Sequence, residues 1–130
     1  ASVFLLRHLA STQHIGIGVQ VAIAIGTRDQ TKWCDVKILI LGGYGTFGGR
    51  LAELLCDIPD LHLQICGRDI GKATAFCATL SGHATHHAFD RADLAQHIKT
   101  LAPDLVVDAS GPFQDYGDAR YSVIETCIAA

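Results

Sequence analysis

The segment KILILGGYGTFGGRLAELL, residues 37–55, constrains the fold of this chain more than any other. Its apolar run, Lys37–Leu41, is typical of a strand that is buried on both faces. Five of the next eight residues are glycine, and a helical pattern of apolar residues follows. Because glycine costs backbone entropy, this concentration favours a turn where a ligand or another backbone approaches the main chain closely. The segment therefore predicts a strand, a bare turn and a helix.

The rest of the chain alternates strands with helices. Further strands are expected at Leu61–Cys66, around His86–Phe89 and at Leu105–Ala109. Four apolar stripes predict helices, with these residues facing inward: Phe47, Leu51, Leu54, Leu55 and Ile58 before Pro59; Ala73, Phe76, Cys77 and Leu80 after an Asp69 cap; Leu94, Ile98 and Leu101; and Tyr121, Ile124, Cys127 and Ile128. Strands separated by helices of this length form a parallel sheet with right-handed crossovers, so an α/β fold with helices on both faces is expected.

The first part of the chain carries a different pattern. Residues 15–25, IGIGVQVAIAI, alternate β-branched residues with Gly, Gln and Ala, which predicts a strand. This extra N-terminal strand either extends the main sheet or pairs across a homodimer, because an uncovered strand edge promotes aggregation. Residues 1–13 are expected to form a short helix. We therefore divide the chain into an N-terminal extension, 1–35, and a main domain, 36–130.

Composition excludes several functional classes. Of the 130 residues, 49% are hydrophobic and 18% charged, and the net charge is −3, so a packed globular protein is expected that binds neither nucleic acid nor a membrane surface. The weakly polar run from Ile15 to Gly26 is shorter than the roughly 20 residues that a spanning helix needs. The five cysteines form no CxxC pair, which indicates a reducing, cytoplasmic setting.

The glycine-rich turn matches a nucleotide-binding pattern. Gly43, Gly45 and Gly48 fit GxGxxG, while Gly42, Gly45 and Gly48 fit the alternative spacing GxxGxxG. After a strand and before a helix, this pattern indicates a turn that receives a dinucleotide pyrophosphate at the helix N-terminus. The alternative is a tight turn with a purely structural role.

The end of the second strand indicates which dinucleotide is preferred. An NAD site usually carries an acidic residue here for the ribose hydroxyls. This chain has Cys66-Gly67-Arg68 instead, with Lys72 one turn further along. Arg68 can make charge-assisted hydrogen bonds to a 2′-phosphate, so NADP is favoured over NAD. Asp69 is better explained as a helix cap, and Arg68 as a solvated surface residue remains the alternative.

Two later segments complete the candidate cofactor site. Asp90 follows the third strand and either meets the adenine amino group or caps the next helix. Residues 109–113, Ala-Ser-Gly-Pro-Phe, follow the fourth strand at the edge where open α/β sheets bind ligands. Gly111 allows close backbone contact there, and Pro112 with Phe113 can form a wall on the nicotinamide side. A simple turn is the alternative for this segment.

Other chemistries are weaker. The histidines at 83, 86 and 87 lack nearby acids or cysteines at ligand spacing, so no metal site is expected. Asp108 has a structural hydrogen-bonding role in our interpretation. A methyltransferase-like glycine loop would require an acidic residue at the end of the second strand. A short-chain dehydrogenase would require Tyr-x-x-x-Lys, but Arg120 stands four residues after Tyr116.

Together, GGYGTFGGR, ICGRD, Asp90 and VVDASGPFQDYG resemble the Rossmann-type NADP-binding domain of the saccharopine dehydrogenase-like oxidoreductases, from Val36 to Ala130. The resemblance implies pyrophosphate contacts from the glycine loop, a phosphate contact from Arg68, and nicotinamide contacts from residues after the fourth strand. The implied residues are Gly43, Gly45, Thr46, Phe47 and Gly48 for the pyrophosphate, Arg68 for the adenosine phosphate, and Ser110, Gly111 and Pro112 for the nicotinamide half.

The resemblance also implies a function. The chain is expected to bind NADP(H) within an oxidoreductase that transfers hydride to or from a small-molecule substrate of unknown identity. Family members continue beyond this domain with a substrate domain, so catalytic residues are expected after Ala130 and little turnover is expected from these residues alone. The alternative is a non-catalytic dinucleotide-sensing or assembly module.

Overall fold

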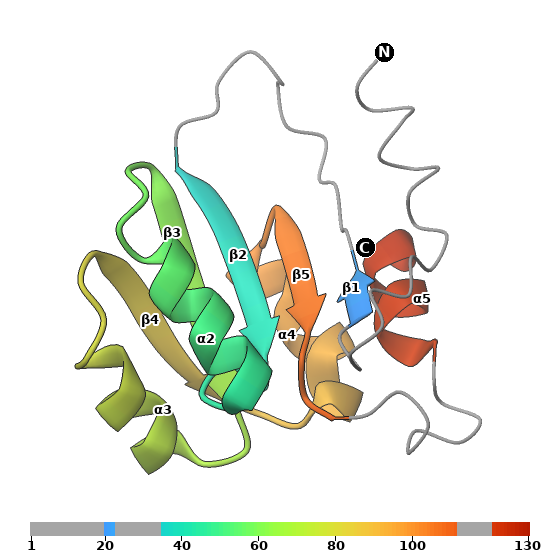
Figure 1. Cartoon of the computed structure of the whole chain (residues 1–130). Helices are drawn as coiled ribbons and strands as arrows, with labels where there is room; N and C mark the ends of the chain where they lie inside the picture. The colour runs from blue at the N-terminus through green and yellow to red at the C-terminus, as the bar shows by residue number, and fades with distance from the viewer. Residues whose placement is uncertain (1–19, 23–34, 112–120) are drawn as a thin grey trace.

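The main feature of the fold is a five-stranded sheet with the order β1-β5-β2-β3-β4 (Figure 1). The computed structural model describes residues 20–22, 35–111 and 121–130. Its strands are β1 (Gln20–Ala22), β2 (Val36–Leu41), β3 (Leu61–Gly67), β4 (His83–Ala88) and β5 (Leu105–Asp108). Strands β2 to β5 pair in parallel, and β1 pairs antiparallel with β5. The expected α/β fold is confirmed.

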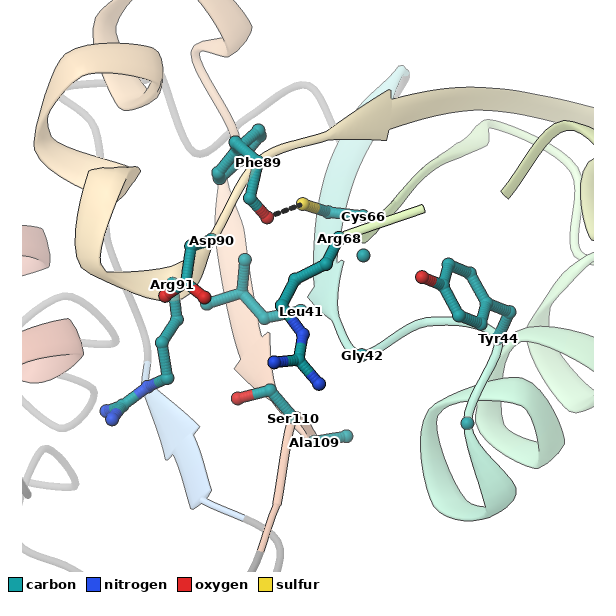
Figure 2. A pocket seen from close by; sticks show the side chains of 12 residues that line it. Leu41, Gly42, Tyr44, Cys66, Arg68, Phe89, Asp90, Arg91, Ala109 and Ser110 are labelled. Carbon is teal, nitrogen blue, oxygen red and sulfur yellow. Dashed lines mark hydrogen bonds between the residues drawn. The ribbon is translucent and has the colours of Figure 1, made fainter. Parts of the chain in front are cut away.

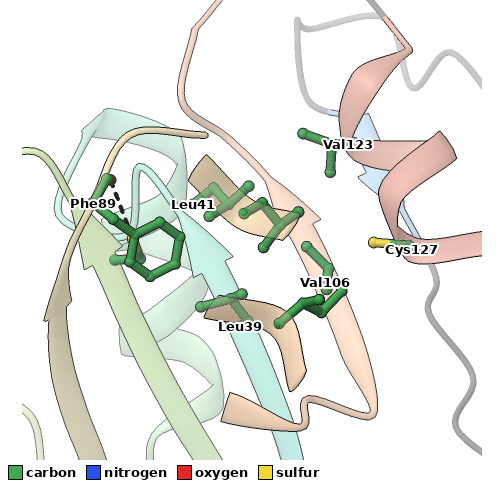
Figure 3. Close-up of a cluster of buried hydrophobic side chains, with 9 residues drawn as sticks. Leu39, Leu41, Phe89, Val106, Val123 and Cys127 are labelled. Carbon is green, nitrogen blue, oxygen red and sulfur yellow. Dashed lines mark hydrogen bonds between the residues drawn. The ribbon is translucent and has the colours of Figure 1, made fainter. Parts of the chain in front are cut away.

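Helices cover both faces of the sheet. They are α2 (Thr46–Leu55), α3 (Ile70–Cys77), α4 (Leu94–Leu101), which follows a 3-10 turn at Arg91–Asp93, and α5 (Ser122–Ala129). Along β2, Ile38 and Ile40 pack with Ala52 of α2, whereas Leu39 and Leu41 pack with α4 and α5. Figure 3 shows part of this second cluster, including Phe89, Val106, Val123 and Cys127. Consecutive residues of one strand thus point into two separate cores, which explains the continuous apolar run.

The strand order contains a reversal next to β2. The chain proceeds from β2 to β3 to β4 in one direction, and α4 then carries it back to β5 on the other side of β2. In open α/β sheets, ligands bind at the carboxyl edge where such a reversal occurs. The edge between β2 and β5 is therefore the place at which a ligand site is expected.

The extra N-terminal strand extends the main sheet. Gln20, Val21 and Ala22 pair with Asp108, Val107 and Val106. For residues 20–22 this pairing confirms the first of the two predicted possibilities, extension of the main sheet. Residues 15–19 and 23–25 of the predicted strand, and the helix expected at 1–13, lie outside the described residues. Within the described part of the chain, no helix is long and apolar enough to span a bilayer.

The predicted inward stripe of α2 is wrong in part. Phe47, Leu54 and Ile58 are 50%, 61% and 45% exposed, and the helix ends at Leu55. Its buried residues are Gly48, Gly49 and Ala52. The glycines let the helix approach the turn and the sheet so closely that the small residues, and not the largest apolar ones, define the inner face. Periodicity alone could not distinguish these neighbouring faces.

Smaller differences occur elsewhere in the fold. Strand β4 begins at His83, three residues before the predicted start. In α5 the buried residues are Val123 and Cys127, whereas Tyr121 and Ile128 are 45% and 71% exposed. The start of helix α3 agrees with the prediction: Asp69 caps it by accepting a hydrogen bond from the Lys72 amide at 3.1 Å, and its buried residue is Ala73. The helix ends at Cys77, before the predicted inward residue Leu80.

Gly71 is a glycine that the fold does not need. It lies exposed in the first turn of α3, and outside the helix backbone the nearest described atom to an added Cβ would be Asp69 Oδ1, at 3.3 Å. We expect Gly71→Ala to raise the free energy of unfolding by about 0.4–1 kcal/mol, because it restricts the unfolded chain. Urea denaturation checks this. A loss of stability would show that the new methyl group displaces the Asp69 cap.

Candidate functional site

The carboxyl ends of the central strands form an open cleft (Figure 2). Leu41 pairs with Cys66 on one side and with Asp108 on the other, so the strand ends lie level at this edge. The cleft has a volume of about 370 Å³. Four loops contribute its lining, which consists of Leu41, Gly42, Tyr44, Gly45, Cys66, Gly67, Arg68, Phe89, Asp90, Arg91, Ala109 and Ser110.

Three glycines shape the loop between β2 and α2. Gly42 has a φ of +73°, and a Cβ there would lie 2.6 Å from the Ala109 carbonyl oxygen. Gly45 is the exposed N-cap residue of α2, and a Cβ on Gly48 would overlap the Gly42 carbonyl oxygen. Gly42 makes the turn, Gly45 leaves the main chain bare at the cleft, and Gly48 allows close packing. These are the roles of a GxxGxxG motif, the second of the two spacings predicted.

Gly43 has a different environment. It is buried, its amide donates to the Cys66 carbonyl oxygen at 3.0 Å, and a Cβ would lie 2.9 Å from Ile65 Cγ2. The amide is therefore committed to the sheet edge, and Gly43 is not among the residues that line the cleft. The GxGxxG spacing makes Gly43 the first glycine of the motif, but in the structure Gly42 makes the turn.

The N-terminus of α2 provides a partial positive charge beside this loop. The N-cap residue Gly45 has no side chain to cap the helix, and the first turn of α2 contains no acidic residue. Thr46 and Phe47, the first helical residues, are exposed. Uncapped amides and the helix dipole together favour an anion at such a position.

Arg68 provides a full positive charge at the end of β3. Its side chain is exposed and extends across the cleft in Figure 2, in the direction of Gly42 and Ser110. Within the described part of the chain, no hydrogen bond or ion pair engages the guanidinium. Asp69 next to it serves as the α3 cap, as expected, and accepts from the Lys72 amide. Lys72 is exposed and does not line the cleft.

The end of β4 closes the cleft on the adjacent side. The Asp90 carboxylate accepts a hydrogen bond from the Ala92 amide at 3.0 Å, so its capping role is present, and the residue also lines the cleft. The Cys66 thiol donates to the Phe89 carbonyl oxygen at 3.6 Å. Burial raises the pKa of this thiol to about 11, so Cys66 is a protonated structural group and not a nucleophile at neutral pH.

A buried ion pair holds the loop after β5. Asp108 is only 1% exposed, and its Oδ1 accepts from both the amide and the hydroxyl of Ser110, at 3.1 and 2.6 Å. Its Oδ2 lies 3.3 Å from Arg91 Nε, in ion-pair contact without hydrogen-bond geometry. Arg91 Nη2 also donates to the Ser122 hydroxyl of α5 at 3.4 Å. Arg91 thereby connects the β4, β5 and α5 sides of the cleft.

The structure brings together four of the residues predicted for the site: Gly45, Arg68, Asp90 and Ser110 line one cleft. Thr46, Phe47 and Gly48 belong to the adjoining first turn of α2, while Gly111 is half-buried beyond Ser110. The Pro112 prediction lies outside the described residues, as does that for Phe113.

Sequence reasoning assigned no site role to Tyr44 or Arg91. Tyr44 stands inside the glycine motif, between Gly43 and Gly45, and this position is the sequence feature that could have indicated a role in the site. Arg91 follows Asp90, but its partner Asp108 is remote in sequence, so no local pattern indicates the pair.

The strand order, the glycine loop and the ligand edge define a Rossmann-like domain. A family model described as the saccharopine dehydrogenase NADP binding domain matches residues 38–130. The chain belongs to this family and carries its NADP-binding domain, which confirms the family resemblance and the cofactor. No curated protein matches the chain.

The residues present fit a dinucleotide. A Cβ at Gly42 or Gly48 would fill space that the backbone occupies, and only bare main chain faces the cleft at Gly45. The positive charge of Arg68 also matches the ligand. Arg68 lies at the strand end where dinucleotide-binding domains contact the adenosine ribose.

Proposed function

We propose that this domain holds NADP(H) for hydride transfer within a saccharopine dehydrogenase-like oxidoreductase. The observation that supports this most strongly is that the glycine loop at the α2 N-terminus and Arg68 line the same cleft. In the proposed complex the amides of the first turn of α2 bind the pyrophosphate, which approaches the bare main chain of Gly45. Arg68 binds the 2′-phosphate, which would distinguish NADP from NAD.

The remaining residues have positioning roles in this proposal. Asp90 lies beside the adenine half, with one carboxylate oxygen capping the 3-10 turn. Ser110, held by Asp108, presents the loop of the nicotinamide half, together with Gly111 and Pro112. Hydride chemistry is supplied by the nicotinamide when it is bound, while the protein supplies position and electrostatics.

Arg68→Ala is the direct test. We expect the variant to bind NADPH about 10- to 150-fold more weakly, because hydrogen bonds to a charged group are worth about 1.5–3 kcal/mol. Affinity for NADH should change by less than about threefold, because no 2′-phosphate is present. Isothermal titration calorimetry of the native chain with NADPH, NADH and S-adenosylmethionine provides the reference.

Arg50→Ala is a matched control. Arg50 is an exposed arginine whose ion pair with Glu53 lies on the surface of α2, outside the lining of the cleft. Its removal should leave both affinities unchanged. If Arg68→Ala weakened the binding of NADPH and NADH equally, Arg68 could not be assigned to the 2′-phosphate. Binding of S-adenosylmethionine without NADPH would overturn the proposed function itself.

The second candidate is a dinucleotide-sensing or assembly module. The exposed Phe47 and Leu54 of α2, and Ile58 after the end of this helix, favour it, because these apolar side chains lie outside both cores. A longer natural polypeptide containing this domain that holds NADPH but oxidises or reduces no substrate would support the module. We place either function in the cytoplasm, on the cysteine pattern of the sequence.

A further inference from the structure

Tyr44 connects the two loops that carry the phosphate-binding groups. It belongs to the glycine loop between β2 and α2, and its hydroxyl accepts a hydrogen bond from the Asp69 amide at 2.9 Å. Asp69 directly follows Arg68 and caps α3. One tyrosine thus joins the loop after β2 to the loop after β3.

The aromatic ring makes a second contact with the same loop. A Cβ placed on Gly67 would overlap the Tyr44 ring and hydroxyl, so the ring lies directly on the bare backbone of Gly67. Tyr44 therefore contacts the residues on both sides of Arg68. Figure 2 shows Tyr44 and Arg68 in the same cleft, and both residues belong to its lining.

These contacts restrict the backbone from which Arg68 extends. The Arg68 guanidinium is not engaged by another described residue, so the side chain is oriented through its backbone. An arginine on a fixed backbone loses less conformational freedom when it binds an anion, which increases affinity. The same contact fixes the distance between the loop that faces the pyrophosphate and the arginine that faces the 2′-phosphate.

We propose that Tyr44 is a positioning residue that sets cofactor specificity by holding the Gly67–Asp69 backbone against the glycine loop. This inference rests on the proposed function of the cleft. In this inference Tyr44 does not contact the 2′-phosphate itself and acts on it only through Arg68. Gly67 is its required counterpart, because no other residue leaves room for the ring.

Tyr44→Phe tests the hydrogen bond while the ring is kept. We expect NADPH and 2′,5′-ADP to bind about 2- to 12-fold more weakly, the factor that corresponds to one net hydrogen bond. NADH and 5′-ADP should change less than twofold. If all four ligands bound equally more weakly, or if none bound more weakly, Tyr44 would have no role in specificity. Thr79→Val is the control, because it removes a hydroxyl that donates to the Phe76 carbonyl oxygen outside the cleft.

Amide hydrogen exchange provides a test that needs no ligand. In Tyr44→Phe, the Asp69 amide should exchange faster, while amides in the centre of β2 keep their native protection. Unchanged exchange at Asp69 would refute the contact even if affinities fell. A native chain that binds none of the four ligands would refute the proposed function and the specificity role, whereas faster exchange at Asp69 would still show that Tyr44 restrains the loop.

A reciprocal substitution tests the ring contact. Gly67→Ala should weaken NADPH and 2′,5′-ADP selectively, because the methyl group displaces the Tyr44 ring. In a Tyr44→Ala background the space is free, so adding Gly67→Ala should cause less than a twofold further change. Additive losses would show that Gly67 acts independently of Tyr44.

Discussion

Asp108→Ala is expected to destabilise the domain by about 3–5 kcal/mol, the usual cost of removing one partner of a buried ion pair. Asp108 is 1% exposed, and the guanidinium of Arg91 lies beside it with little access to solvent. The substitution removes the Asp108 carboxylate from beside that charge and also removes both hydrogen bonds to Ser110. Urea denaturation monitored by circular dichroism measures the change.

Two further variants show whether the buried charge is the cause. Arg91→Met combined with Asp108→Ala should lose less stability than Asp108→Ala alone, because the buried charge that faced Asp108 is gone. Glu53→Ala breaks the exposed Arg50–Glu53 pair and should cost no more than about 1 kcal/mol. A loss below about 1 kcal/mol for Asp108→Ala would mean that Arg91 reaches water without strain.

Gly42→Ala is expected to have the second large effect. The φ of +73° costs a residue with a Cβ about 1–2 kcal/mol. The new methyl group would also lie 2.6 Å from the Ala109 carbonyl oxygen, and overpacking of this kind adds about 1–3 kcal/mol. Relief of that contact must move the glycine loop away from β5, so NADPH affinity should fall together with stability. Denaturation and calorimetry measure the two losses.

Gly71→Ala is the matched control for this variant, because the same methyl group added in α3 is expected to stabilise the chain. A Gly42→Ala protein with native stability and native NADPH affinity would contradict the close contact between the glycine loop and the end of β5. Native stability with lost affinity would indicate that the methyl group blocks the ligand directly.

The sequence predicted the elements that local rules govern. The run Ile38–Leu41 fills two cores and therefore had to be apolar at every position. The Asp69 cap of α3 was also predictable, since a side chain and an amide three residues later suffice for it. Arg68 could be assigned to the cleft because the carboxyl ends of parallel strands share one edge.

Other features depend on contacts between distant residues. The inner face of α2 is set by how closely Gly48 approaches Gly42, so the larger Phe47 and Leu54 remain exposed. The choice between the two glycine spacings also required the φ of Gly42 and the bond from the Gly43 amide to Cys66. Neither can be read from a pattern of glycines alone.

The sequence by itself determined that this chain forms a strand, a glycine turn and a helix, and that the next strand ends in an arginine where an acid would select NAD. Only the tertiary structure decided that Tyr44 reaches the Asp69 amide, that Arg91 meets Asp108, and that residues 20–22 complete the sheet beside β5. The physical reason is the range of the interactions. Capping, turns and periodicity act over a few residues, whereas these contacts exist only once the crossovers have placed separate strands side by side.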